Sequence, residues 1–125
     1  MSKRLDFGRL AEKTAVEFLR TKGYNILKQN FRCPFGEIDI IAEDKGTICF
    51  VEVKARHTLG LGAPQEALFA AKQARISKSA ICYLKNNNLF ERPARFDVLA
   101  LLYAKEVPEI SLIKDAFELG SKFTP

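Results

Sequence analysis

The segment most informative about the fold is GEIDIIAEDKGTICFVEVKAR, residues 36–56. Most of it consists of the β-branched, aromatic and other apolar residues that favour strands. The polar connection Glu43–Gly46 near its middle contains a glycine, which is typical of a hairpin turn. We therefore expect a β-hairpin with one strand over Glu37–Ala42 and a second over Thr47–Ala55.

The register of this hairpin follows from its turn. If Lys45 and Gly46 are the two loop residues, each position of one strand faces a defined position of the other. Because side chains alternate along a strand, one face is then wholly apolar and the other is charged. The expected facing pairs are Asp44 with Thr47, Asp39 with Glu52 and Glu37 with Lys54, and the expected apolar face holds Ile38, Ile40, Ala42, Cys49, Val51 and Val53.

Two carboxylates that face each other repel unless a cation lies between them. In this register the Cβ atoms of Asp39 and Glu52 are about 5 Å apart. Mg²⁺ would supply the cation, since it prefers hard oxygen ligands and often takes one or two carboxylates. The alternative is a solvated sheet face, where Glu37 pairs with Lys54 and Asp39 pairs with Lys54 or an arginine.

The first expected helix runs from Leu5 to Lys22 and ends at Gly23, a common helix stop. At about 100° per residue, Glu12 falls in the centre of its apolar stripe, so a carboxylate points toward the core side. The stripe consists of Leu5, Gly8, Ala15, Val16 and Leu19.

The second expected helix begins at Pro64, runs to Leu84 and stops at the asparagines 86–88. Gln73 lies within its inward face by the same arithmetic. Buried polar groups are costly unless they have partners, so Glu12 and Gln73 together indicate one polar cluster at the sheet. In the alternative, each is satisfied separately, Glu12 by a loop amide or a lysine and Gln73 by a strand edge. The inward face consists of Phe69, Ile76, Ala80 and Leu84.

The rest of the chain completes an αβββαβ order followed by a short tail. A strand is expected over Tyr24–Phe31, a turn with Pro and Gly over Arg32–Gly36, a strand over Phe96–Leu102 and a further one over Ile110–Ile113. The length of 125 residues suits one domain over residues 1–125. This order predicts an α/β fold.

Composition excludes several classes of protein. No apolar run approaches the roughly 20 residues that cross a bilayer, and the N-terminus lacks the apolar stretch of a signal peptide, so we expect a cytoplasmic protein. The three cysteines are expected to be buried free thiols. The net charge of +5 fits a polyanionic partner without identifying one. The cysteines are Cys33, Cys49 and Cys82.

Three segments together resemble the YraN family of uncharacterised bacterial proteins. They are GEIDIIA at residues 36–42, FVEVKAR at residues 50–56, and Lys72-Gln73 in the second helix. That family belongs to the PD-(D/E)xK nuclease superfamily and is similar to archaeal Holliday junction resolvases. The resemblance spans nearly the whole chain and implies a restriction-endonuclease-like core, a mixed sheet flanked by helices. One departure is Ile38, which stands where the superfamily name implies a proline.

The resemblance also implies roles for individual residues. Lys54 would orient the attacking water or stabilise charge on the phosphate. Gln73 would position Lys54, the water or a phosphate. The implied cofactor is Mg²⁺ or Mn²⁺. Its implied ligands are Asp39, Glu52, the backbone carbonyl of Val53 and, directly or through water, Glu12.

A basic set beyond the hairpin would hold the nucleic-acid backbone through phosphate contacts. The alternative for its helical members is the exposed flank of an amphipathic helix, and for its histidine a plain surface position. Asp97 is either an acid behind the metal ligands or a charge at a strand edge. The basic set consists of Arg56, His57, Lys72, Arg75 and Lys78.

Three functions from different classes follow. The first is a metal-dependent nuclease acting on DNA, branched or single-stranded, in repair, recombination or uptake. The second is a DNA-binding accessory module that keeps the fold but has no turnover or needs a partner protein. The third is a small interaction domain whose polar cluster is structural. Asp39, Glu52 and Lys54 favour the first, and a homodimer is expected only by analogy with resolvases.

Overall fold

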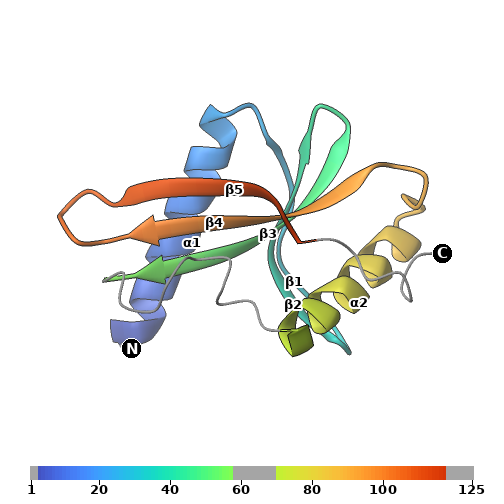
Figure 1. Ribbon diagram of the computed structural model, residues 1–125, viewed down its shortest axis with the longest axis horizontal. Helices are drawn as coiled ribbons and strands as arrows, with labels where there is room; N and C mark the ends of the chain where they lie inside the picture. The colour runs from blue at the N-terminus through green and yellow to red at the C-terminus, as the bar shows by residue number, and fades with distance from the viewer. Residues whose placement is uncertain (1–2, 58–69, 118–125) are drawn as a thin grey trace.

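The computed structural model describes residues 3–57 and 70–117 (Figure 1). Within these residues the chain forms two helices and five strands. In chain order they are α1 (Lys3–Thr21), β1 (Asn25–Cys33), β2 (Gly36–Asp44), β3 (Thr47–Arg56), α2 (Ala70–Asn86), β4 (Ala94–Leu102) and β5 (Glu109–Phe117).

The five strands form one mixed sheet in the order β1-β2-β3-β4-β5. Strands β3 and β4 are parallel and are connected through α2, whereas the other neighbours are antiparallel. The expected α/β class is confirmed, and the arrangement is consistent with a restriction-endonuclease-like fold. The expected short strand at Ile110–Ile113 is longer, because β5 pairs along β4 from Glu109 to Phe117. That a single domain spans residues 1–125 stays a prediction.

The hairpin forms as expected at its turn. Lys45 and Gly46 both have positive φ, 50° and 89°, which is the two-residue geometry that matches strand twist. The register is confirmed from Asp44 opposite Thr47 to Ile40 opposite Val51, where the ladder ends. The expected pairs Asp39 with Glu52 and Glu37 with Lys54 are therefore wrong as backbone pairs. Figure 1 shows the β1–β2 ribbon turning away from β3, which continues beside β4.

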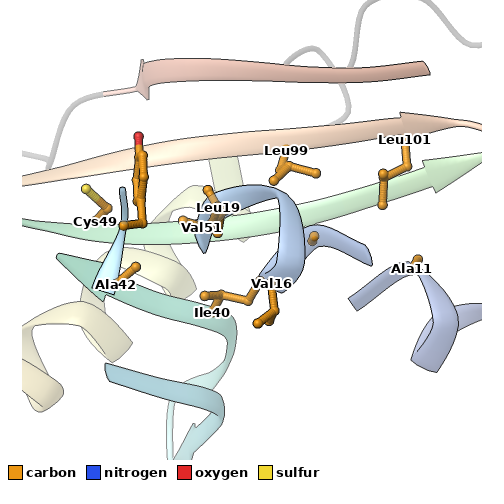
Figure 2. Packing of buried hydrophobic residues seen from close by; sticks show 11 residues of the cluster. Ala11, Val16, Leu19, Ile40, Ala42, Cys49, Val51, Leu99 and Leu101 are labelled. Atoms are coloured by element: carbon orange, nitrogen blue, oxygen red, sulfur yellow. The ribbon is translucent and has the colours of Figure 1, made fainter. Parts of the chain in front are cut away.

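Helix α1 ends where the sequence predicts. Gly23 has a φ of 88°, its N–H donates to the carbonyl of Arg20, and the N–H of Tyr24 donates to the carbonyl of Leu19. These two bonds satisfy the last carbonyls of the helix. Figure 2 shows the helix packed on one face of the sheet. The buried cluster there consists of Ala11, Ala15, Val16, Leu19, Tyr24, Ile40, Ala42, Cys49, Val51, Leu99 and Leu101.

Helix α2 packs on the opposite face and stops at Asn86, as expected. The expected start at Pro64, and Phe69, lie outside the described residues. One sequence expectation is wrong: Ile38 packs in the α2 cluster, although Ile40 packs in the α1 cluster. The β1–β2 ribbon turns at this point, where Asn30 of β1 has a φ of 51°. The buried α2 cluster consists of Ile38, Ile41, Ile48, Phe50, Ile76, Ala80, Tyr83, Leu84, Phe96 and Val98.

The second face of the hairpin is thus not a continuous charged surface. Ile41, Ile48 and Phe50 on that face are buried under α2, and the charged residues expected there lie at the end where β2 and β3 separate. Glu43, on the same face near the turn, pairs with Arg92. No described helix is long and apolar enough to cross a membrane. The three cysteines are free, but only Cys49 is buried; Cys33 and Cys82 are half-buried where the end of β1 meets α2.

Candidate active site

The candidate site lies in the fork between β2 and β3. Beyond Ile40 and Val51 no further backbone pair joins the two described strands. The side chain of Asp39 replaces a backbone acceptor there, because its Oδ2 accepts a hydrogen bond from the N–H of Val53 at 2.8 Å. In an extended strand the N–H and the carbonyl of one residue point to the same side, so the carbonyl of Val53 also points into the fork.

Glu52 is the second carboxylate of the fork. Its side chain is 13% exposed, and its Oε1 lies 2.9 Å from the ammonium of Lys72 and 3.8 Å from that of Lys54. Lys72 is in the first turns of α2, so this helix places a lysine ammonium next to a carboxylate of the sheet. The sequence predicted Lys72 as a phosphate contact only, and its direct pairing with Glu52 was missed.

Around Asp39, negative side chains outweigh positive ones. Burial and the nearby carboxylates of Glu52, Glu12 and Glu37 raise the pKa of Asp39 to about 7, against the lowering effect of the Val53 N–H. The pKa of Glu12 is also raised, first by burial and then by Glu37 and Glu52, although a hydrogen bond with Asn30 opposes the shift. A carboxylate in this position gains from a nearby cation.

The two lysines behave differently. Burial and the neighbouring ammonium of Lys72 lower the pKa of Lys54. Burial also lowers the pKa of Lys72, but its contacts with Lys54 and Glu52 outweigh burial and leave that pKa above the ordinary lysine value. The two ammonium groups, both near Glu52, therefore have pKa values shifted in opposite directions, and perturbed lysines of this kind cluster at functional sites.

A cleft of about 880 Å³ opens over the fork. Glu12 of α1 reaches it from one side, and Asp39, Val53 and Lys54 line it from the strands. The structure therefore brings four of the predicted site residues to one cavity, whereas Glu52 is not among the residues that line it. Residues of the cleft that sequence reasoning missed are Phe7, Arg9, Asn30 and Arg32.

A pattern in the sequence would have found one of these missed residues. Arg9 stands three residues before Glu12, so the two share a side of the helix. Asn30 and Arg32 carried no such signal, because their approach depends on the turn of the β1–β2 ribbon.

The remaining predicted residues are less central. Gln73 is half-buried on α2, next to Lys72. Arg75 and Lys78 are exposed on the same helix, and the ammonium of Lys78 lies 5.9 Å from the centre of the Phe35 ring. Arg56 is half-buried at the end of β3, and His57 is exposed.

The donor set fits a hard divalent cation. The Glu52 carboxylate is close enough to Asp39 to raise its pKa, which a cation would relieve. The extended geometry of β3 turns the Val53 carbonyl into the same fork. In the described part of the chain, no three His, Cys, Asp or Glu side chains are grouped so as to hold a metal ion. Mg²⁺ does not need three, because it keeps several waters and commonly takes one or two carboxylates.

Asp97 lies apart from the fork in a structural network. Its side chain is fully buried, both of its oxygens accept bonds from the Nε of Arg95 at 3.0 and 3.1 Å, and Oδ1 accepts one from the N–H of Asp115. Arg95 also binds Asp44 and the hydroxyl of Tyr24. Asp97 is therefore neither an acid behind the fork nor an exposed charge at a strand edge.

Comparison with known proteins gives one consistent family. Its sequence profile, described as Uncharacterised protein family UPF0102, matches residues 11–101. A UPF0102 protein of Syntrophus aciditrophicus is 51% identical over 120 residues, which covers 96% of this chain and 94% of that protein. Another from Geotalea uraniireducens is 50% identical over 114 residues, 90% of each chain. A third, from Clostridium kluyveri, is 43% identical over 116 residues, 91% of this chain and 95% of that protein.

Proposed function

The chain belongs to the UPF0102 family, also called YraN, and from the geometry of its cleft we propose that it is a metal-dependent nuclease that hydrolyses DNA phosphodiester bonds. The observation that carries the proposal is the fork, where Asp39 binds the Val53 N–H at 2.8 Å beside Glu52 and Lys54. A sheet selected for stability alone has no use for buried carboxylates that raise one another's pKa.

Asp39, Glu52 and the Val53 carbonyl would hold Mg²⁺ or Mn²⁺, with Glu12 at the side of the same cleft. When bound, the metal would lower the pKa of a water and polarise a phosphate oxygen. Lys54 would hold the water or a phosphate oxygen. Lys72, whose ammonium pairs with Glu52, would compete with the cation for that carboxylate.

The remaining cationic side chains would position the DNA. Arg9 and Arg32 line the cleft, and Arg32 is highly exposed, with its Nε 3.7 Å from a carboxylate oxygen of Glu37. Exposed guanidinium groups at the mouth of a cleft suit phosphate oxygens. Within this proposal Arg56, His57, Arg75 and Lys78 keep their predicted role as further backbone contacts. Gln73 keeps its role beside Lys72.

The proposal extends to setting and partners. DNA, branched or single-stranded, is the proposed partner, and the cytoplasm is the proposed location. A homodimer, and a partner protein in DNA processing, are proposed by analogy with resolvases.

The deciding experiment incubates the purified protein with linear, single-stranded and four-way-junction DNA in Mg²⁺, Mn²⁺ or EDTA. We expect metal-dependent cleavage by the wild type and by Glu43→Gln, a control that neutralises a carboxylate on the same strand. We expect none by Asp39→Asn or Glu52→Gln, with DNA affinity nearly unchanged. Cleavage at the wild-type rate by either of these two variants would end the assignment.

One observation favours a second candidate, a DNA-binding accessory module without turnover of its own. The ammonium of Lys72 lies 2.9 Å from Glu52, so a side chain already supplies the cation that this carboxylate needs. This candidate predicts binding with a steep dependence on salt, because counterions are released, and no cleavage of any of the three DNA forms with either metal.

A further inference from the structure

Two aromatic rings, one of which lines the cleft, are stacked on each other. The ring of Phe7, from α1, is stacked on that of His57, which directly follows β3; their centroids are 4.5 Å apart and their planes meet at 23°. Tyr103, just past β4, contacts the same phenyl ring edge-on at 5.0 Å and 67°. The Phe7 ring is thus held in place by two neighbours from other parts of the fold.

These rings differ from the aromatic side chains of the core. Phe50 and Phe96 are 2% and 4% exposed, whereas Phe7 is half-buried and His57 is exposed. Phe7 also lines the cleft. An aromatic ring that is rigidly supported and open to a cleft is suited to stacking on a flat ligand.

The same cleft carries the groups that a nucleotide needs. Its lining includes Lys54 and Asp39 from the fork, and Arg9 and Arg32 as cations. Guanidinium groups bind phosphates, and aromatic rings bind bases of any sequence because every base has a π face. This combination of groups suits a ligand that carries both phosphates and flat rings, as a nucleic acid does.

We propose that an unpaired nucleotide stacks on the Phe7–His57 pair, so that the cleft takes single-stranded or frayed DNA and not an intact duplex. Within a duplex both faces of each base are covered by its neighbours, and only an unpaired base is free to stack on a protein ring. The proposal rests on the proposed function for the chemistry that follows binding, but binding itself needs no metal.

The test measures fluorescence anisotropy of a labelled oligonucleotide in EDTA, single-stranded or annealed to its complement. We expect the wild type to bind the single strand more tightly than the duplex. Phe7→Leu, which keeps apolar volume without a π face, should weaken single-strand binding about tenfold and leave duplex binding unchanged. His57→Ala, at an exposed position, should weaken single-strand binding by a similar factor and duplex binding less, through the backbone contact proposed for His57. Phe7→Trp should bind like the wild type, as should Phe90→Ala, which removes an aromatic residue 39% exposed in the connection between α2 and β4.

A second readout reports stacking itself. A single strand carrying 2-aminopurine loses fluorescence when that base stacks, and we expect this quenching with the wild type and Asp39→Asn but not with Phe7→Leu. Unchanged single-strand affinity in Phe7→Leu and His57→Ala, or equal losses for both DNA forms, would overturn the proposal. Quenching through Phe7 without any metal-dependent cleavage would leave the stacking site standing and remove the nuclease. Cleavage that depends on Asp39 but not on Phe7 would keep the nuclease assignment and rule out the stacking site.

Discussion

Asp44 ends β2 at the hairpin turn and Asp39 lies in the other half of the strand, and their surroundings shift their carboxyl pKa values in opposite directions. A hydrogen bond from Arg95 lowers the pKa of Asp44, and the ammonium of Lys114 adds to that effect. Burial and the neighbouring Glu52 raise the pKa of Asp39 to about 7. One end of the strand therefore has enough cations for its carboxylates, and the other half does not.

The well-paired end is a stabilising network. Arg95 binds Asp44 at 3.0 Å, Asp97 at 3.0 Å and the hydroxyl of Tyr24 at 2.7 Å, so one guanidinium holds β2, β4 and the residue before β1 together. At the fork, no lysine or arginine of the described ranges, 3–57 and 70–117, forms such a pair with Asp39. Burial of an aspartate alone therefore does not indicate function, whereas burial with unbalanced charge does.

The largest expected effect comes from breaking the well-paired end. Arg95→Ala should lower the free energy of unfolding by about 3 kcal/mol, because it leaves the buried Asp97 carboxylate without its cation. Urea denaturation at pH 7 measures the loss. The matched control is Arg32→Ala, whose exposed contact with Glu37 should contribute less than about 1 kcal/mol. Equal losses in the two variants would mean that the Arg95 network is not a main source of stability.

The next effect concerns how Asp39 makes the free energy of unfolding depend on pH. Between pH 3.8 and about 7 the folded protein keeps a proton on Asp39 that the unfolded chain has released. The contribution of Asp39 to the free energy of unfolding should therefore fall as pH rises through this window and stay constant above it. Asp39→Asn removes that dependence and should be more stable than the wild type at pH 8, by on the order of 2 kcal/mol, and equally stable near pH 4.

Melting curves of both proteins with Mg²⁺ and with EDTA extend this prediction. Metal at 100 times its dissociation constant should stabilise the wild type by about 2.7 kcal/mol, whereas Asp39→Asn should respond little. If ordinary ion pairs satisfied the fork, Asp39→Asn would lose stability and Mg²⁺ would do nothing specific. A destabilised variant together with an indifferent wild type would contradict the metal site.

The smallest effect on stability is expected at Lys72. Its pair with Glu52 is partly exposed, so Lys72→Met should change the free energy of unfolding by less than about 1 kcal/mol. Mg²⁺ should nevertheless bind a few-fold more tightly, because Glu52 no longer has a competing ammonium. Calorimetric titration measures this, with Lys78→Met on the exposed part of the same helix as the control. Weaker Mg²⁺ binding would show instead that Lys72 supports the metal ligands.

Local patterns in the sequence predicted much of the fold. Gly23 ended α1 as expected, since its positive φ suits a helix stop. The Lys45-Gly46 turn set the hairpin register as far as Ile40 and Val51. The periodicity of α1 placed Glu12 on the cleft side. Each of these depends on backbone dihedrals or on side-chain spacing within one element, which the sequence carries directly.

The candidate site was predicted in composition but not in geometry. Asp39, Glu52 and Lys54 do gather at one place, yet Asp39 faces the Val53 N–H and not a strand partner. The prediction of facing pairs assumed that β2 and β3 stay paired along their length, but they separate after Ile40 and Val51. Ile38 was assigned to the wrong face for the same reason, because the β1–β2 ribbon turns where the ladder ends.

Local patterns in the sequence were enough to place the elements, their order, the hairpin turn and the set of acidic and basic side chains available to a site. Three features emerged from the folded chain alone: Lys72 meets Glu52, Arg95 joins Asp44 to Asp97, and Phe7, which lines the cleft, stacks on His57. The two groups of features differ in how far apart along the chain the interacting residues lie. Turn conformation and helical or strand period act over a few residues, whereas these contacts join segments that meet only after both helices have packed on the sheet.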